Sequence, residues 1–517
     1  SKLFVKIHPG VFSQIMEGAD GILRMPGGCF EQTSSSAYPN VLAVDYLKRT
    51  HTENPAAMMK AEQYLNAGYQ RLLTFEHKTG GFDWWGQEQN EPLIWVSAYG
   101  LQEFNDMSKV YPVDHGVIDR TQAWLLKQQA ADGTWEKIGM THNETIASMG
   151  DPKLLLTSYV TWTLLDTGLK SPQLDKSVAY IRDHAKDSDN AYILALAANA
   201  LAAWDAKDDA THDVLTRLLK KLDAMQKDKP EWKAISFPTN GQSLAYARGE
   251  SLTVETTALT VLAMLKSGQF PNDVNKALIY LVKSKDPSGT WGSTSATILS
   301  LKALINAAGG AQQKGTATFA IAVNGKEAAR GEITEQNADV MQVFDLKDFV
   351  KPGANDVTID VQGETNAMYQ ITARHYEPWP KEPPQKPLLA VSVDYDRTRL
   401  TTADVLDATA TLKYNGAEPT AMVMLDLGIP PGFTADAGDF AEMVGARKVQ
   451  KFSLTERQAI LYLGDVEPNR EYKFKYSLRP KYPVKAKTPS TVAYEYYTPD
   501  HRATAAPVEL VVEEAKK

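Results

Sequence analysis

The sequence has 517 residues, of which 43% are hydrophobic and 23% are charged, and its formal net charge is −8. This composition is typical of globular protein, and the length exceeds what one core can serve, so we expect about three domains. The acidic balance argues weakly against a nucleic-acid partner, and no apolar run is long enough to insert into a membrane. A lone cysteine, Cys29, excludes an intramolecular disulfide.

The chain opens with a short apolar run from Leu3 to Ile7. This run predicts a β-strand, and it is far too short to be the hydrophobic region of a signal peptide. We therefore expect the chain to be a piece cut from a longer protein.

The first chemical motif is built around Cys29. Gly27 and Gly28 precede it, which lets the backbone turn tightly, and Gln32 follows three residues later. A Cys29 thiolate that attacked the Gln32 carboxamide would expel ammonia and leave an internal thioester, an activated acyl group that needs no cofactor. For an isolated C-x-x-Q pattern, the alternative is a buried, inert cysteine that acts as a small apolar residue.

Residues 26–32, PGGCFEQ, resemble the thioester signature of the alpha-2-macroglobulin and complement superfamily. The common form of that signature is Gly-Cys-Gly-Glu-Gln, and here Phe30 replaces the glycine after the cysteine. This departure suggests a bacterial-type member. The resemblance implies a Cys29–Gln32 crosslink.

The region from about Tyr38 to Ala308 predicts helices in repeated units. Pro39 suits a helix start, and apolar residues follow it at helical spacing. Turns with a glycine before an aromatic residue, such as Gly133-Thr134-Trp135, punctuate the region and indicate repeated helical hairpins. Further helices are expected at Leu93–Phe104, Leu154–Leu165, Tyr192–Trp204, Leu252–Leu265 and Ser295–Ile305.

Such hairpins can close into an alpha/alpha toroid, an architecture that also occurs in terpene cyclases and prenyltransferases. Those enzymes need an acidic cluster that protonates or ionises the substrate. The nearest candidate is the segment 208–213, DDATHD, which we interpret as a solvated helix start. A toroid enzyme therefore remains the less favoured alternative.

His142 is the second candidate catalytic residue, in the segment THNETI at 141–146. Its His-x-Glu-x-Ile context resembles the segment that carries the catalytic histidine of complement thioester domains. A neutral imidazole could attack the thioester carbonyl, after which the freed Cys29 thiolate could act as general base toward a hydroxyl. A histidine chosen blindly would more often be structural.

The last third of the chain predicts β-structure in two pieces. Residues 316–376 alternate apolar and polar positions, and Val323-Asn324-Gly325-Lys326 predicts a type I′ hairpin. By resemblance, the toroid is inserted in a CUB domain whose sheet includes Leu3–Ile7. A proline-rich linker at 377–387 precedes a predicted β-sandwich. The expected domains are 1–12 and 313–380 for the CUB domain, 13–312 for the thioester toroid and 388–517 for the terminal macroglobulin domain.

Within the terminal domain we expect strands at Val405–Leu412, Ala459–Leu463, Tyr472–Leu478 and Val508–Val512, and a short helix near Asp439–Val444. The domain resembles the receptor-binding domain of the same family, most clearly at residues 492–499, VAYEYYTP. In the family, aromatic side chains of this domain cover the thioester, which must be kept from water. The candidate shields are Tyr496 and Tyr497, with Met25 and Tyr38 as local walls.

The sequence is thus identified as the C-terminal part of a bacterial-type alpha-2-macroglobulin. The resemblance implies a protease trap: cleavage of an upstream bait region exposes the thioester, which acylates the attacking protease once. We expect no turnover as an enzyme, no cofactor, no metal, a monomer, and a periplasmic or secreted location at the cell envelope. The alternatives are a thioester-based surface adhesin, and a cysteine hydrolase that uses Cys29 and His142.

Overall fold

The fold is that of a computed structural model, which describes residues 2–9, 28–50, 55–86, 91–136, 151–226, 234–286, 289–308, 316–337, 340–363, 365, 367–375, 387–420, 422–496 and 498–515. The chain packs into two units, Ser1–Tyr376 and Glu377–Lys517. Each unit is described by itself.

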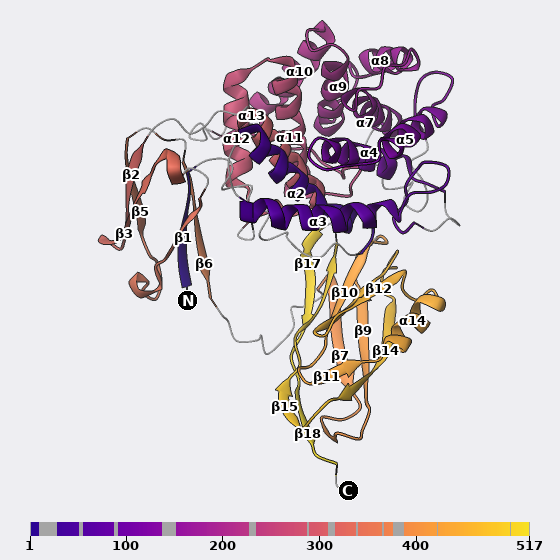
Figure 1. The fold of residues 1–517 in the computed structure, drawn as a ribbon, viewed down its shortest axis with the longest axis vertical. Coiled ribbons are helices and arrows are strands. Elements are labelled where there is room, and N and C mark those ends of the chain that lie inside the picture. The colour runs from indigo at the N-terminus through magenta and orange to yellow at the C-terminus, as the bar shows by residue number, and fades with distance from the viewer. Residues whose placement is uncertain are drawn as a thin grey trace. The chain divides into compact units, whose positions relative to one another are not determined.

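The helices of the first unit form two layers (Figure 1). In the inner layer each helix contacts the next, and the last, α13, contacts the first, α2, which closes a ring in the order α2, α4, α7, α9, α11, α13. The inner helices are α2 (Phe30–Thr50), α4 (Ile94–Ser108), α7 (Pro152–Asp166), α9 (Ala191–Trp204), α11 (Gly249–Ser267) and α13 (Thr294–Ala308).

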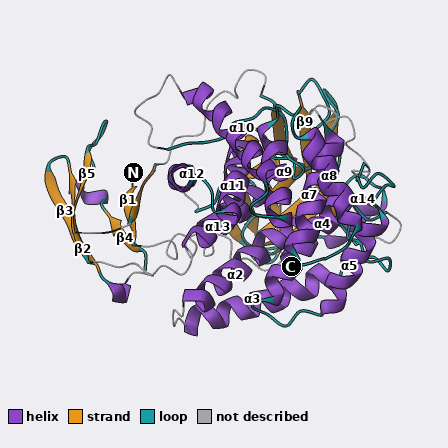
Figure 2. Cartoon of the chain, turned by 90° about the horizontal axis from the view of Figure 1, so that it is seen from above, coloured by secondary structure: helices purple, strands orange, loops and turns teal. Residues whose placement is uncertain are grey.

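Each remaining helix of this unit packs outside the inner helix that precedes it in the chain. In Figure 2, α3, α5 and α12 lie at the margin of the helical cluster. The outer helices are α3 (Pro55–Leu73), α5 (His115–Lys127), α8 (Gln173–His184), α10 (Asp209–Gln226) and α12 (Pro271–Lys283). This closed double layer is the predicted alpha/alpha toroid.

Burial explains the two layers. Every residue of α9 from Ala191 to Ala202 is buried, so the helix is covered on all sides. In α12, by contrast, the buried residues Val274, Ala277 and Leu281 recur at helical spacing on one face. A helix of the first kind must be surrounded by other helices, whereas one of the second kind needs cover on one side only.

The predicted glycine–aromatic turns are repeated structural units. Gly80, Gly133 and Gly289 adopt φ values of +97°, +88° and +89°, in the left-handed region that favours glycine. The aromatic residue that follows is buried, and its backbone N–H donates to a hydroxyl on the next inner helix. The pairs are Phe82 with Ser97, Trp135 with Thr157 and Trp291 with Thr297. Phe237, which follows no such glycine, makes the same hydrogen bond to Thr257.

The expected helix start at Pro39 is wrong, because α2 begins at Phe30 and Pro39 lies inside it. Proline removes a backbone donor and disturbs the carbonyl one turn earlier. Side chains satisfy carbonyls in this stretch: Ser35 donates to the Gln32 carbonyl at 2.8 Å and Asn40 donates to the Ser36 carbonyl at 2.6 Å. The helix nevertheless continues through the proline to Thr50. The other five predicted helices match α4, α7, α9, α11 and α13.

The β part of the first unit consists of two three-stranded sheets, ordered β4-β1-β6 and β3-β2-β5, around a shared apolar core. The helices lie between β1 and β2 in the chain, as predicted. At the β2–β3 turn, Asn324 and Gly325 both have positive φ, so the type I′ hairpin is confirmed. The elements are β1 (Lys2–His8), β2 (Ala317–Val323), β3 (Lys326–Ile333), η1 (Glu335–Asn337), β4 (Gln342–Asp345), η2 (Lys347–Phe349), β5 (Val357–Gly363) and β6 (Met368–Arg374).

The second unit is a β-sandwich with sheets ordered β12-β13-β10-β16-β17 and β11-β14-β9-β7. The strand expected at Val508–Val512 is β18, and it lies in a third sheet, β15-β18-β8, outside the two sheets of the sandwich. The elements are β7 (Leu389–Tyr395), β8 (Arg399–Thr401), β9 (Leu406–Tyr414), β10 (Val423–Gly428), β11 (Phe433–Ala435), α14 (Ala437–Gly445), β12 (Lys451–Leu454), β13 (Gln458–Tyr462), β14 (Glu471–Pro480), β15 (Val484–Lys487), β16 (Thr491–Glu495), β17 (Thr498–Ala505) and β18 (Glu509–Glu513).

Candidate functional site

The Cys29–Gln32 motif forms the N-terminal end of α2. Cys29 is fully buried, and its backbone N–H donates a 3.2 Å hydrogen bond to Oε1 of Gln32. Gly28 has φ +83°, and a Cβ atom added there would overlap Oε1 of Gln32. The carboxamide of Gln32 is therefore folded back over Gly28 and lies against the start of the helix. The two residues singled out by the sequence are brought together.

Arg71, in the last turn of α3, holds both sides of this motif. Its guanidinium donates to the carbonyl oxygen of Gly28 at 2.8 Å and to the Thr33 hydroxyl at 3.3 Å. The Thr33 hydroxyl in turn donates to the carbonyl oxygen of Cys29 at 3.0 Å. The sequence analysis missed Arg71, because nothing near it in the chain marks it as a partner of residues 43 positions earlier.

Phe30, the departure from the family signature, fills the space beneath the motif. Its ring packs against Phe75, Phe82 and Tyr99 with ring centroids 5.7, 5.4 and 6.3 Å apart. Gly100 on α4 makes room for it, since a Cβ atom there would come within 2.8 Å of the Phe30 ring. The larger residue after the cysteine is thus matched by the smallest residue on the neighbouring helix.

A second aromatic group borders the backbone of the motif. The backbone N–H of Phe30 donates to the carbonyl oxygen of Trp84 at 2.9 Å. The Trp84 ring packs against Trp95 at 5.1 Å and against Tyr246 at 6.4 Å between ring centroids. Trp84 belongs to the glycine–aromatic turn at Gly80, which the sequence analysis treated only as a link between helices. Its contact with the Cys29 motif was therefore not predicted.

Tyr38 lies farther along α2, and its hydroxyl points into a charged cluster. It donates to Oδ2 of Asp106 at 2.7 Å, and Lys302 lies 2.9 Å from the same carboxylate. Burial raises the pKa of Tyr38. Burial would also raise the pKa of Asp106, but Lys302 and Lys109 outweigh it and hold that pKa well below its usual range.

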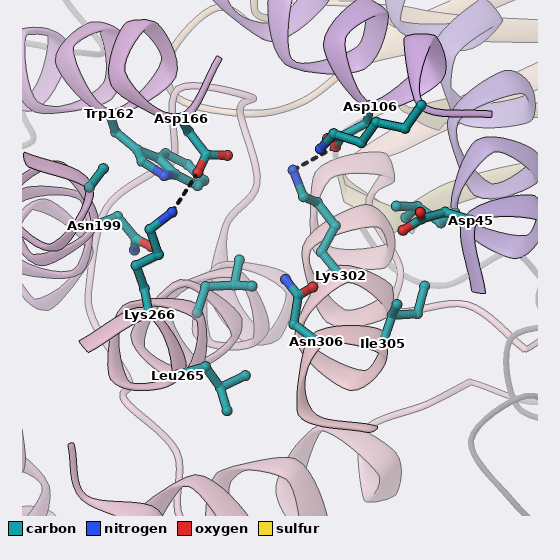
Figure 3. Close-up of a pocket in the computed structure, with 14 residues that line it drawn as sticks. Asp45, Asp106, Trp162, Asp166, Asn199, Leu265, Lys266, Lys302, Ile305 and Asn306 are labelled. Carbon is teal, nitrogen blue, oxygen red and sulfur yellow. Dashed lines mark hydrogen bonds and ion pairs between the residues drawn. The ribbon is translucent and has the colours of Figure 1, made fainter. Parts of the chain in front are cut away.

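This cluster borders a cavity of about 350 Å³ lined by residues near the C-terminal ends of the inner helices. Figure 3 shows Lys266 facing Asp166 on one side of the cavity and Lys302 facing Asp106 on the other. Asp45 and Asn306 also line it. The ring of inner helices therefore carries a charged cavity at one end, while the Cys29 motif lies at the N-terminal end of α2.

Glu103 and Glu255 are buried carboxyl groups on inner helices. Glu103 accepts a hydrogen bond from the Ser34 hydroxyl, and burial raises the pKa of Glu103 to about 8. Glu255 on α11 accepts a 3.1 Å hydrogen bond from Ser293, and burial raises its pKa to about 7. A carboxyl group without a countercharge is stabilised in its neutral form by such a site.

Comparison with protein families matches two models to the chain. Residues 6–306 match the A-macroglobulin TED domain, and residues 418–507 match the A-macroglobulin receptor binding domain. The first match covers more than half of the chain. The chain belongs to the alpha-2-macroglobulin family.

Two curated relatives show how much of such a protein is present. The chain is 24% identical to ovostatin from Gallus gallus over 98% of its own length and 35% of that protein. It is also 24% identical to alpha-2-macroglobulin-like protein 1 from Mus musculus, over 90% of the chain and 32% of that protein. The chain thus spans about a third of the length of these A-macroglobulins.

Solved structures share the fold. The native alpha-2-macroglobulin of Escherichia coli, spanning domain MG7 to the C-terminus, matches with TM-score 0.67 and 16% identity over 99% of this chain and 77% of that one. A Salmonella alpha-2-macroglobulin reacted with methylamine matches with TM-score 0.64 and 15% identity, over 99% and 31%. The predicted toroid followed by a β-sandwich is therefore the architecture of the C-terminal part of an A-macroglobulin.

The structure does not test several of the residues that were predicted for the site. Met25, His142 and Tyr497 lie outside the described residues. Tyr496 is half-buried at the end of β16, and its backbone N–H donates to the Met422 carbonyl at 3.0 Å. It belongs to the second unit, so its role as a shield is untested.

The described residues also bear on the toroid-enzyme alternative, on membrane spans and on metal sites. The acidic segment 208–213 is the start of α10, where Asp208 pairs with Arg182 and accepts from the backbone N–H of Ala210 at 3.0 Å. None of the described helices is long and apolar enough to cross a membrane. Among the described residues, no group of three or more His, Cys, Asp and Glu side chains could hold a metal ion.

Proposed function

We propose that Cys29 and Gln32 form an internal thioester that acylates a protease once, after cleavage of a bait region elsewhere in the full protein. The observation that carries this proposal is the 3.2 Å hydrogen bond from the Cys29 backbone N–H to Gln32 Oε1, in a chain that matches the TED domain. This hydrogen bond holds the carboxamide beside the cysteine that precedes it by three residues, which favours ring closure.

The chemistry balances without a cofactor. The Cys29 sulfur bonds to the Gln32 amide carbon, the bond from that carbon to Nε2 breaks, and the thiol proton leaves with the nitrogen as ammonia. An amine that later attacks the same carbon forms a new amide at residue 32 and returns the thiol to Cys29. One acyl group is used per chain, so the protein is a single-turnover acyl donor rather than a catalyst.

Intact mass and thiol titration test the proposal. We expect the native chain to weigh one ammonia less than its sequence predicts, and methylamine to release one thiol and label Gln32. Methylamine is the probe with which the Salmonella relative is described as reacted. A freely titratable thiol in native protein of unmodified mass would contradict the thioester. Repeated turnover of an ester would instead support the cysteine hydrolase.

The second unit is proposed to shield the thioester, with Tyr496 and Tyr497 as candidates and Met25 and Tyr38 as local walls. This proposal is supported by the match to the receptor binding domain and by the need to keep an activated acyl group from water. Deletion of residues 388–517 should speed methylamine attack. An unchanged thioester lifetime in the truncated chain would place the shield elsewhere.

The remaining features of the proposal follow from the family. The β part formed by β1 to β6 is proposed to be a CUB domain, with boundaries at 1–12 and 313–380, flanking a toroid at 13–312 and followed by the terminal domain at 388–517. The protein is proposed to act as a monomer at a bacterial cell envelope, periplasmic or secreted. The adhesin alternative is tested by whether the full protein is cleaved and then coupled to a protease.

A further inference from the structure

The hydrogen bond between Cys29 and Gln32 has a consequence for the reaction itself. When the sulfur attacks the Gln32 amide carbon, negative charge develops on Oε1. The Cys29 backbone N–H already donates to that oxygen at 3.2 Å. A fixed donor aimed at the oxygen on which charge develops is the defining feature of an oxyanion hole.

That donor is aimed by the peptide between Gly28 and Cys29, which the backbone alone does not fix. Gly28, with φ +83°, has no side chain to restrict it. Arg71 supplies the restriction. One of its N–H groups donates to the Gly28 carbonyl oxygen at 2.8 Å. That carbonyl and the Cys29 N–H belong to the same peptide group. The orientation of that carbonyl sets the orientation of the N–H.

The same guanidinium also fixes the far side of the motif. Its Nε donates to the Thr33 hydroxyl at 3.3 Å, which donates to the Cys29 carbonyl at 3.0 Å. The side chain lies beside the Phe75 ring, 5.7 Å from its centroid, and Phe75 packs under Phe30. A planar fork with several N–H groups can bind both acceptors at once, whereas a lysine ammonium has a different shape and reach.

We propose that the Cys29 backbone N–H is the oxyanion donor for formation and opening of the thioester, and that Arg71 is the positioning residue that aims it. The inference rests on the proposed function. In the forward step the sulfur–carbon bond forms while Oε1 carries the charge. The carbonyl then re-forms as the carbon–nitrogen bond breaks and ammonia leaves with the thiol proton. In the reverse step an amine takes the place of ammonia and the thiol is released.

The test measures chemistry separately from folding in the Arg71→Lys and Arg71→Ala variants. Loss of a single oxyanion donor costs about 10²–10³-fold in rate. A misaligned donor should cost less, so we expect methylamine to react roughly tenfold more slowly with the thioester of Arg71→Ala. Arg71→Lys should fall between that variant and wild type. The fraction of chains that carry the thioester, read from intact mass, should fall in the same order.

Two further variants separate positioning from stability. Arg120→Ala removes an outer-layer arginine that pairs with Glu76 at 2.9 Å and is half exposed, so it should leave both thioester fraction and rate unchanged. Thr33→Val removes only the second arm of the clamp and should slow methylamine by a smaller factor than Arg71→Ala. It also serves as the test if Arg71→Ala does not fold.

The outcomes are distinct. A wild-type chain without a thioester overturns the proposed function. A wild-type thioester together with wild-type rates in folded Arg71→Lys and Thr33→Val chains overturns only this inference. Rates that fall in proportion to Tm across all four variants, Arg120→Ala included, would make Arg71 structural and also overturn it. Slower chemistry at unchanged Tm, confined to Arg71 and Thr33, supports it.

Discussion

The two ends of the inner helices differ in kind. Around Cys29 the neighbours are aromatic rings, glycines, backbone hydrogen bonds and the Arg71 guanidinium, whereas the cavity at the C-terminal ends is lined by three aspartates and three lysines. An activated acyl group must be kept from water, and a charged, hydrated surface beside it would work against this. The difference suggests that the first end is built for chemistry and the second for holding the ring together, and substitutions can test that division.

The largest effect is expected at Gly28. In Gly28→Ala the new Cβ would overlap Gln32 Oε1 and the backbone would be strained at φ +83°, so the carboxamide could not reach Cys29. We expect no thioester and an unmodified mass. Gly268→Ala is the matched control, because Gly268 also has positive φ, at +69°, but has open space around it. That variant should lose some stability and keep the thioester; loss of the thioester in both would contradict the steric argument.

The second prediction concerns His142 and the nucleophile with which the thioester reacts. If its imidazole forms an acyl intermediate, His142→Asn removes that route and the general-base help of the freed thiolate, which is typically worth about 10²–10⁴-fold. Glycerol coupling and hydrolysis should therefore slow sharply while methylamine still reacts. Product ratios are measured by mass after both proteins are shown to carry the thioester. Equal glycerol-to-amine partitioning would remove His142 from the mechanism.

At the charged end, Lys302→Met should change stability and not chemistry. Lys302 and Asp106 are only 11% and 12% exposed, and removing one partner of a buried pair costs roughly 3 kcal/mol of unfolding free energy, moderated here by Lys109. Lys266→Met is the control, because that lysine is 53% exposed and should cost at most about 1 kcal/mol. Denaturant unfolding gives both values. A slower methylamine reaction in folded Lys302→Met would show that the two ends are coupled.

The last prediction is a pH dependence that originates at Glu103 on α4. The pKa of Glu103 rises from its ordinary value of 4.5 to about 8 on burial. Between these values the unfolded chain releases a proton that the folded chain keeps, so the free energy of unfolding falls as pH rises through this window. Glu103→Gln removes the titrating group and should flatten that slope between pH 4.5 and 8. Unfolding curves at several pH values measure it; an unchanged slope would mean that Glu103 is ionised in the folded chain.

The sequence predicted these features unequally, for physical reasons. The toroid, the hairpin at Asn324 and the Cys29–Gln32 pair depend on local spacing, which a sequence displays directly. The start of α2 was misplaced because Pro39 is an ordinary helix-start signal, whereas in the structure it lies inside the helix. Arg71 and Gly100 become visible only when α3 and α4 pack against α2, since their contacts cross 43 and 70 positions of the chain.

The closed ring also has a consequence for the order of folding. α2 contacts both α4 and α13, and Lys302 reaches Tyr38 across 264 positions of sequence. Joining segments so far apart requires a large loss of chain entropy, so contacts of this kind form late. The helix that carries Cys29 therefore reaches its final surroundings only after the last inner helix has been synthesised. In the proposed function, the thioester of Cys29 and Gln32 would thus lie on a helix whose surroundings are complete only when the ring has closed.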